Sequence, residues 1–326
     1  MAATAELGLR PQKKFVTIGH ITEDVIPNRH LGGGVSYSGV VAKESGYHTS
    51  ILTKCRPEDP YVTYLREKRG IEVYVAPSNL NTITTFENIY DDRGNREQKV
   101  TDRQEILSSA DLDTIPTDLL EGAIVLAAPV IGEVDMRMFP ILAAKGATVA
   151  VTPQGYFREA GDDGKVKQKR WTGFEEYLPH ANGGVVFSIE DIKIGGKVDE
   201  GLKNEILATA PLAAMTLAEK GVVIYEQSKD PVHIPAFPLH KREEIDYTGA
   251  GDTFTARWLI EMAITNGDTK KSGATATLFT ALKIAALAGD GIDSIPPKEK
   301  VENFVRMNRE RVNRHYENNG VENPFK

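Results

Sequence analysis

The sequence lacks the features that mark secreted, membrane or nucleic-acid-binding proteins. Its 326 residues include a single cysteine, Cys55, so no disulfide can form within the chain and we expect a reducing compartment. The first 15 residues contain no apolar segment typical of a signal peptide, and no run approaches the roughly 18 uncharged apolar residues of a membrane span. The formal net charge is −7, which leaves no basic surplus to bind a nucleic-acid backbone. The sequence therefore predicts a cytoplasmic protein with a small-molecule partner and no nucleic-acid or membrane partner.

Several catalytic motifs are also missing. The chain has no GxxxxGK[ST] phosphate-binding loop, no HExxH motif, no CxxC pair and no GxSxG elbow. Their absence excludes a P-loop kinase by motif and removes support for zinc and serine hydrolases. No GxGxxG follows the first predicted strand, so a dinucleotide-binding oxidoreductase is also disfavoured.

What the sequence does contain is an alternation of strand and helix patterns. Short β-branched or apolar runs predict buried strands. These runs are Phe15–Gly19, Thr49–Thr53, Ala123–Val130, Thr148–Thr152 and Gly184–Ser188. Helical patterns at Ser36–Gly46 and Val134–Gly146 lie between some of them. The alternation predicts an α/β protein with a mainly parallel sheet that helices cover on both faces.

Three segments depart from this alternation. Gly70–Val100 has period-2 patterning, a turn signal at Asp91–Asn95 and no helix signal, which predicts an antiparallel flap. Lys220–Phe237 has a second hairpin pattern. Lys298–Tyr316 predicts one charged amphipathic helix on the surface.

A helix with a glycine-rich start is predicted near residue 250. Phe254, Trp258 and Met262 recur at i, i+4 and i+8, which indicates a core-facing stripe. Asn266-Gly267 is a typical helix end. The stretch Gly249-Ala250-Gly251 would then present unpaired backbone N–H groups at the helix N-terminus, where they attract an anion such as a phosphate group.

Asp252 follows these glycines directly. Its carboxylate could accept a proton from a hydroxyl that attacks the bound phosphate. The helix N-terminus is expected to lower its pKa. From these four residues alone, a glycine-rich turn with an Asp N-cap is an equally good interpretation.

The segment DYTGAGD at residues 246–252, with Phe254, resembles the carboxy-terminal signature of the ribokinase-like (PfkB) carbohydrate kinase family, with one Thr missing. The resemblance extends over about Phe15–Pro297. It implies a three-layer αβα fold in a single kinase domain spanning 13–320. A small β-sheet lid would come from about 70–103, with 22–34 as a second contributor, and 1–12 would be a flexible N-terminus.

The resemblance also implies an acceptor site. GHITEDVI and LGGGVSYSG resemble the family's first strand and its Gly-Gly turn. They match Asp24 to a group that binds sugar hydroxyls, and Gly32 and Gly33 to backbone that approaches the sugar closely. The other implied substrate-binding positions are Tyr37 in place of the family's Asn, Thr85 on the lid strand, and Gln154 in place of an Asp-Pro-Asn element.

On the donor side, the resemblance implies ATP and Mg²⁺ as cofactors, with K⁺ as a further candidate. VVFSIEDI resembles the family's Asn-x-x-Glu element, with Ser188 at the Asn and Glu190 as the Glu that would orient water around Mg²⁺. TLAEKGVVIYE resembles a strand and turn that place Thr216, Glu219 and Gly221 near the nucleotide. Asp246 and Thr248 match the family's monovalent-cation site.

The departures from the family pattern cluster on the sugar side. They favour an ATP-dependent kinase of a sugar or a cyclitol such as inositol over a ribose kinase. Two alternatives stay open: a nucleoside kinase whose base contacts Tyr37 and Phe86, and a sensor that binds sugar or nucleotide without turnover. The resemblance also allows a homodimer through the flap. Its exposed face would carry Val73, Val75, Ile83 and Phe86.

Overall fold

The computed structural model describes residues 13–25, 29–90, 96–238, 247–285 and 291–325. The predicted flexible segment 1–12, the turn 91–95 and Asp246 lie outside the described residues. Within them, no helix is both long enough and apolar enough to cross a bilayer.

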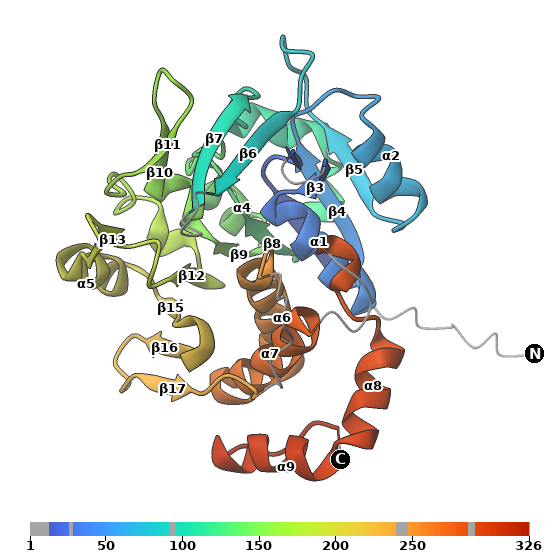
Figure 1. Ribbon diagram of the computed structural model, residues 1–326, viewed down its shortest axis with the longest axis vertical. Coiled ribbons are helices and arrows are strands. Elements are labelled where there is room, and N and C mark those ends of the chain that lie inside the picture. Colours follow the sequence, from blue (N-terminus) through green and yellow to red (C-terminus); the bar gives the residue numbers. More distant parts are fainter. Residues whose placement is uncertain (1–12, 26–28, 91–95, 239–246, 286–290, 326) are drawn as a thin grey trace, which may run out of the picture.

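The largest sheet has nine strands in the order β17-β16-β15-β12-β9-β8-β1-β4-β5 (Figure 1). The seven strands from β15 to β5 are parallel to their neighbours, and β16 and β17 extend the sheet as an antiparallel edge. The bounds are β1 Lys14–Ile18, β4 His48–Thr53, β5 Glu72–Val75, β8 Ile124–Ala127, β9 Thr148–Val151, β12 Gly184–Ser188, β15 Leu212–Thr216, β16 Val222–Glu226 and β17 Val232–Ile234. The predicted strands and the second hairpin are confirmed.

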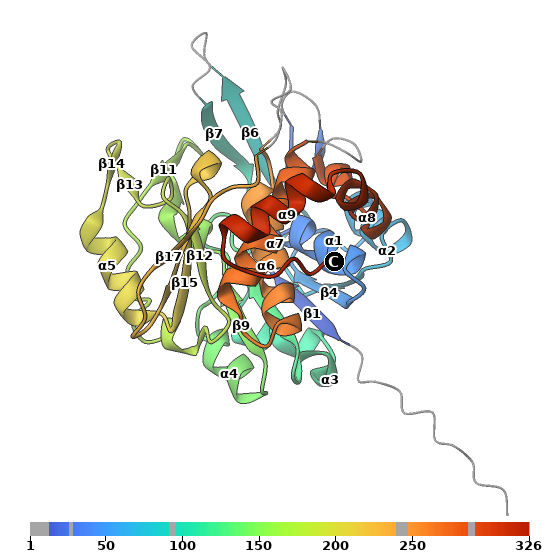
Figure 2. The same cartoon turned by 90° about the horizontal axis from the view of Figure 1, so that it is seen from below.

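Helices cover both faces of this sheet, as Figure 2 shows. Successive side chains of a strand point to opposite faces. Leu126 of β8 therefore belongs to the core cluster that includes residues of α1, α6 and α7, and Val125 belongs to the cluster that includes residues of α3, α4 and α5. These helices are α1 Gly34–Glu44, α3 Thr117–Leu120, α4 Met138–Ala144, α5 Glu200–Thr209, α6 Ala250–Ile264 and α7 Thr269–Ile284. Burial of both faces explains why the parallel strands are continuous apolar runs, and it confirms the three-layer αβα fold.

A second sheet of four strands, in the order β3-β2-β6-β7, forms a lid that projects from one end of the molecule (Figure 2). Its strands are β2 Thr22–Asp24, β3 His30–Gly32, β6 Thr84–Tyr90 and β7 Arg96–Asp102. β6 and β7 pair antiparallel, as predicted for the flap, and β2 joins the lid parallel to β6. Both β2 and β6 leave the central sheet in the same direction, so they pair side by side.

The predicted flap began too early, at Gly70. Glu72–Val75 is not part of the lid but forms β5, the edge strand of the central sheet. It pairs in parallel with β4 after the crossover helix α2, Pro60–Glu67, which the sequence pattern did not reveal. Asp59 caps that helix by accepting the N–H of Tyr61 at 3.0 Å.

The apolar face proposed for a dimer is not exposed. The exposed fractions of Val73, Ile83 and Phe86 are 4%, 3% and 3%, and Val75 is half-buried against the core. Val73 and Ile83 belong to the main core, and Phe86 packs beneath the lid with Val100. These four side chains stabilise the monomer instead of presenting an apolar surface.

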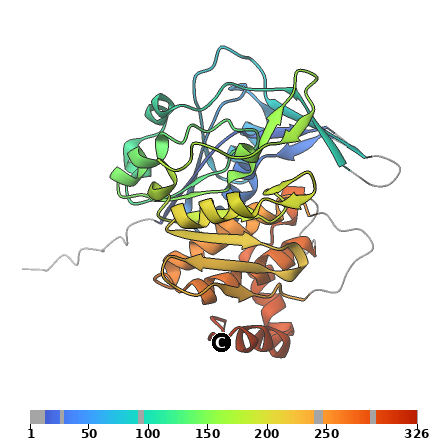
Figure 3. The same ribbon diagram turned by 90° about the vertical axis from the view of Figure 1, so that its left-hand side faces the viewer.

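The C-terminal segment forms two helices, α8 Lys298–Met307 and α9 Arg309–Asn318, where one was predicted. The helix breaks at Asn308, whose side chain amide donates to the carbonyl of Phe304 at 3.0 Å. Each helix buries one face, with Val305 and Val312 in the core. Both helices lie at the opposite end of the molecule from the lid (Figure 1 and Figure 3).

Candidate active site

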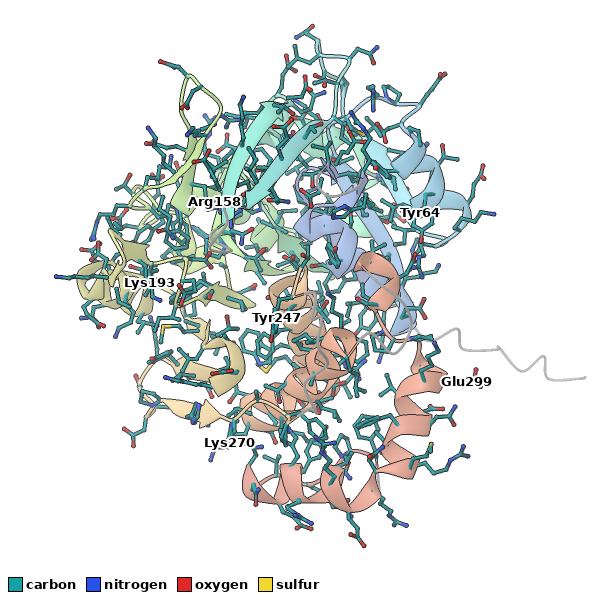
Figure 4. All side chains as sticks on the ribbon, viewed as in Figure 1. Tyr64, Arg158, Lys193, Tyr247, Lys270 and Glu299 are labelled. Carbon is teal, nitrogen blue, oxygen red and sulfur yellow. The ribbon has the colours of Figure 1, made fainter. Side chains whose placement is uncertain are left out.

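A cleft of about 1080 Å³ lies where the lid meets the carboxyl ends of the parallel strands and the N-terminus of α6. In open α/β sheets this edge collects the loops that bind ligands. Figure 4 shows Arg158 close to the lid strands and Tyr247 beside α6, on either side of this region. The sequence-predicted residues that line the cleft are Asp24, Gly33, Tyr37, Gln154, Ser188, Glu190, Thr216, Glu219, Gly221, Thr248, Gly249, Ala250, Gly251 and Asp252.

The start of α6 is built around Gly249, which has φ 72° in the left-handed region. A Cβ at this position would lie 2.2 Å from the Tyr37 ring, so a larger residue is excluded by packing as well as by conformation. The N–H of Ala250 donates to the carbonyl of Tyr247 at 3.0 Å and is therefore not available to a ligand, contrary to the sequence-based expectation. The backbone N–H groups of Gly249 and Gly251 remain candidate hydrogen-bond donors to an anion.

Gly251 has open space in front of it. A Cβ added there would meet no described atom within 4 Å, and the residue is exposed to the cleft. Because the first amides of a helix have no partner within the helix, this is the position where an anion can approach α6. The geometry can therefore accommodate a phosphate group at the head of the helix.

Asp252 occupies the first turn of α6, and its side chain is half-buried. Burial and then the nearby Asp191 raise its pKa from 3.8 to about 6, against the positive charges of Arg158 and Lys283. The expectation that the helix N-terminus would lower this pKa was wrong. The loss of hydration and the like charge of Asp191 outweigh the helix dipole.

Asp191, and not Glu190, is the carboxylate that acts on Asp252. β12 ends at Ser188, and the Asp191 side chain turns back to accept the Ser188 N–H at 2.8 Å. Glu190 also lines the cleft, but its side chain is 64% exposed and pairs with Lys193 Nζ at 2.6 Å. The spacing of Ser188 and Asp191, three residues apart, was the signal in the sequence for this assignment. Burial raises the pKa of Asp191 as well.

Arg158 supplies positive charge at the same place. It begins β10, Arg158–Ala160, which forms a short hairpin with β11, Val166–Gln168. Its guanidinium donates to Gln98 Oε1 of lid strand β7 at 3.3 Å and lowers the pKa of both Asp191 and Asp252. The sequence contains no pattern that links Gln98 to Arg158, because they meet only when the lid packs on β10.

The acceptor end of the cleft contains Asp24, the last residue of β2. Its Oδ2 lies 3.6 Å from His30 Nε2. Gly32 lies directly behind this carboxylate, since a Cβ there would come 2.8 Å from Asp24 Oδ2. Gly33 lines the cleft itself, together with Gly34, which the sequence analysis did not single out.

Two predicted substrate contacts have other roles. Thr85 is not among the described residues that line the cleft, and its hydroxyl donates to the carbonyl of Ile83 at 3.1 Å. Phe86, the next residue of β6, and Gln98 of β7 line the cleft instead. Tyr37 is 1% exposed, and its ring packs beneath Gly249, so it shapes the start of α6 more than the acceptor pocket.

The donor end lies along β15 and the turn that follows it. Thr216 ends β15, and Glu219 lies in the short 3₁₀ turn Ala218–Lys220. Gly221 has φ 97°, and a Cβ there would lie 2.0 Å from the carbonyl oxygen of Ile234, so only glycine allows β17 to approach. Beyond this turn the cleft wall is apolar. It is formed by Leu217, Val222, Ala281, Ile284 and Ala285.

No family model matches the chain, and no curated protein matches it significantly. Among solved structures, a sulfate complex of a pyrophosphate-dependent kinase in the ribokinase family has 23% identity and a TM-score of 0.71, covering 89% of this chain and 99% of its own. A pyrophosphate-dependent kinase in the ribokinase family with a pyrophosphate analog and myo-inositol has 23% identity and a TM-score of 0.68, with the same coverage.

An Arabidopsis thaliana ribokinase complexed with ribose and ATP has 15% identity and a TM-score of 0.66, covering 90% of this chain and 99% of its own. The similarity covers 89–90% of this chain and 99% of each of these solved chains. The chain therefore has the ribokinase fold, a three-layer αβα core with a β-sheet lid.

Proposed function

We propose that the protein is a kinase that transfers the terminal phosphoryl group of ATP to a hydroxyl of a sugar or cyclitol. The observation that carries this proposal is the position of Asp252. It lies at the N-terminus of α6, in the same cleft as Asp24, with a pKa raised to about 6. A carboxylate with this pKa is mostly ionised at pH 7 yet is a stronger base than an ordinary Asp.

The acceptor end suits a small polyol. Asp24, Gln98 and Gln154 offer hydrogen-bonding groups, and Phe86 and Val130 offer an apolar face for C–H groups. The lid strands that carry Phe86 and Gln98 cover this end and would limit access of water to the reacting hydroxyl. Solved relatives in fold include one with myo-inositol and one with ribose, which supports a sugar or cyclitol as the acceptor.

The proposed reaction is a phosphoryl transfer from the donor to the acceptor hydroxyl. The acceptor hydroxyl oxygen attacks the terminal phosphorus, its proton passes to Asp252 Oδ, and the bridging P–O bond to the leaving diphosphate breaks. The N–H of Gly251 and the positive end of α6 stabilise the negative charge on the transferring group. Arg158 adds positive charge on the side of the lid. This arrangement provides positioning and charge stabilisation, which phosphoryl transfer chiefly needs.

The donor end favours a nucleotide. A base could cover the apolar wall formed by Leu217, Ile284 and Ala285, whereas pyrophosphate would leave that wall in contact with water. Pyrophosphate is the second candidate donor, because solved kinases of the same fold use it. The experiment that tests the proposal therefore compares ATP and pyrophosphate as phosphoryl donors.

Mg²⁺ fits the chemistry of this end of the cleft. Asp191 provides carboxylate oxygens next to Asp252, and Mg²⁺ is usually held by one or two carboxylates together with phosphate oxygens. When bound, the ion would neutralise charge on the donor phosphates. Within the described residues, no group of three His, Cys, Asp or Glu side chains forms a metal site by itself.

We place the reaction in the cytoplasm, in keeping with the single cysteine, Cys55, which is buried as a free thiol.

The test is a screen of donors against acceptors with Mg²⁺ present. ATP, GTP, ADP and pyrophosphate are each combined with inositol, ribose, fructose and nucleosides, and phosphorylated product is detected by mass spectrometry. We expect product with ATP and a sugar or cyclitol, and none with the Asp252→Asn variant. Phosphorylated nucleosides would support the nucleoside kinase instead. Ligand-induced thermal shifts without product from any pair would identify a sensor.

A further inference from the structure

Lys283 is a buried lysine at the end of α7, only 1% exposed. Its Nζ donates to the backbone carbonyl of Thr248, the residue before Gly249. The same ammonium lies 5.7 Å from the centre of the Tyr37 ring, within the range of a cation–π interaction. A residue of α7 thus contacts both the loop that leads into α6 and the ring that packs beneath it.

Burying an ammonium group is costly unless its charge is compensated. Here the compensation comes from groups around the phosphate site: the Thr248 carbonyl, the Tyr37 ring and the negative charge of Asp252, whose pKa Lys283 lowers. Lys283 also lies in the last turn of α7, where the helix dipole favours a cation. A fixed positive charge is therefore part of the structure at the start of α6.

This arrangement does not fit the monovalent cation that the family resemblance implied. A K⁺ ion at that position would need the Thr248 carbonyl as an oxygen ligand. That carbonyl already accepts a hydrogen bond from Lys283, which brings the same single positive charge to the same oxygen. An ammonium and a potassium ion in adjacent positions would repel each other, and Tyr37 fills the space beneath Gly249.

We propose that the Lys283 ammonium takes the place of the monovalent cation, so that the start of α6 is ordered without K⁺. Lys283 is a positioning residue: it fixes the Thr248 carbonyl and, through it, the backbone of Gly249 and Gly251 that faces the donor phosphate. Its effect on catalysis rests on the proposed kinase function, but its exclusion of K⁺ does not.

The first experiment measures phosphoryl transfer by the wild-type protein in buffers whose only monovalent cation is K⁺, Na⁺ or tetramethylammonium, at constant ionic strength. We expect equal rates in the three buffers. A rate that rises several-fold in K⁺ alone would overturn the proposal. This arm needs no variant and is therefore independent of whether any substitution impairs folding.

The second experiment removes the built-in cation. Lys283→Met should reduce kcat by about 100-fold, because the amides at the start of α6 lose their position, and K⁺ or methylammonium should restore part of the rate. Lys283→Arg should retain more activity than Lys283→Met. Lys270→Met is the matched control, since Lys270 is exposed at the other end of α7 (Figure 4), and it should match the wild type. If Lys283→Met loses activity and neither K⁺ nor methylammonium restores any of it, the Lys283 ammonium does not take the place of a monovalent cation.

A third measurement separates this inference from the kinase function. The melting temperature is recorded while K⁺ replaces Na⁺, without substrates. K⁺ should leave the wild type unchanged and raise the melting temperature of Lys283→Met, because a ligand that binds only the folded state stabilises it. A K⁺-specific rise in the wild type would overturn the proposal. If no donor and acceptor pair reacts, the kinase function fails while this result still decides the role of Lys283.

Discussion

The carboxylate of Asp252 lies against the backbone of Gly34, so closely that a Cβ at Gly34 would come 2.7 Å from Asp252 Oδ1. Gly34 begins α1 and Asp252 lies in the first turn of α6, and the two helices pack side by side with Ser38 Oγ donating to the Asp252 carbonyl at 3.4 Å. This contact joins the glycine turn at the acceptor end to the candidate base. The close approach requires glycine at residue 34.

Gly34→Ala should therefore reduce phosphoryl transfer by about 100-fold, because the added methyl group displaces the Asp252 carboxylate. Steady-state kinetics on the acceptor identified by the screen would measure the loss. Gly201→Ala in α5 is the matched control, since its Cβ would meet only Asp199 Oδ1, at 3.3 Å. Wild-type kinetics in Gly34→Ala would show that the position of Asp252 does not govern the rate.

Asp252→Asn should lower kcat by about 100- to 10,000-fold, the range expected when a general base is removed. The donor should still bind, because the amides of α6 and the wall beyond β15 are unchanged, and isothermal titration calorimetry would measure that binding. Asp230→Asn, at an exposed position, should leave the rate unchanged. Full activity of the Asn variant would exclude Asp252 as the base.

The rate should depend on pH through Asp252. With its pKa raised to about 6, the base is protonated below pH 6, so kcat/KM should rise with pH and level off above about 7. A profile that is flat down to pH 5 would contradict this assignment.

The same raised pKa makes a prediction for stability. The folded protein binds the Asp252 proton more tightly than the unfolded chain, so this stabilisation is present below pH 4 and is lost as pH rises through about 6. Asp252→Asn should thus be more stable than the wild type at pH 7, by about 1–3 kcal/mol. Urea unfolding of both proteins at pH 4 and pH 7 would show whether the difference is small at the lower pH and large at the higher pH.

Asp191→Asn and Glu190→Gln should separate the two neighbouring carboxylates. Asp191→Asn should reduce the rate about 10- to 100-fold, as loss of a group that orients a metal or its water does. It should also move the acidic limb of the pH profile to lower pH, because the charge of Asp191 raises the pKa of Asp252. Glu190→Gln breaks only an exposed ion pair with Lys193 and should resemble the wild type. If Glu190→Gln lost more activity than Asp191→Asn, Glu190 and not Asp191 would be the functional carboxylate.

Glu133 should be important for stability. Its side chain is fully buried and accepts the backbone N–H groups of His20, Val130 and Ile131 at 3.1, 2.9 and 2.8 Å. Glu133→Gln replaces one acceptor oxygen with a donor and should cost about 2–4 kcal/mol in the free energy of unfolding, because buried N–H groups lose their partner. Denaturant unfolding measures this, with the exposed Glu121→Gln as control. If Glu133→Gln and Glu121→Gln had the same free energy of unfolding, the hydrogen bonds of Glu133 would not stabilise the fold.

Much of the fold could be predicted because its signals are local. Apolar runs such as Gly184–Ser188 identify strands buried on both faces, and the stripe of Phe254 and Trp258 identifies α6 as a core helix. Adjacent residues alone placed Gly249 and Asp252 at the start of this helix. In each case the physical requirement, whether burial or backbone conformation, involves residues within one or two turns of the chain.

The positions that sequence analysis missed depend on packing between distant segments. Val73 alternates like a flap residue, but the crossover through α2 places its strand at the edge of the central sheet. Lys283 looks like the polar end of a helix, yet tertiary packing brings its ammonium to the carbonyl of Thr248. Neither the pairing of the Val73 strand with β4 nor the hydrogen bond from Lys283 to Thr248 can be predicted from neighbouring residues in the sequence.

The sequence by itself determined the layered architecture and the glycine-flanked carboxylate at the start of α6, because hydrophobic periodicity and left-handed glycine conformations are properties of short segments. Only the tertiary structure decided that Asp191 faces Asp252, that Tyr37 packs beneath Gly249 and that Lys283 supplies the positive charge there. Side-chain direction and the local loss of hydration depend on which segments pack together, and these two effects set the charge and the pKa at the site.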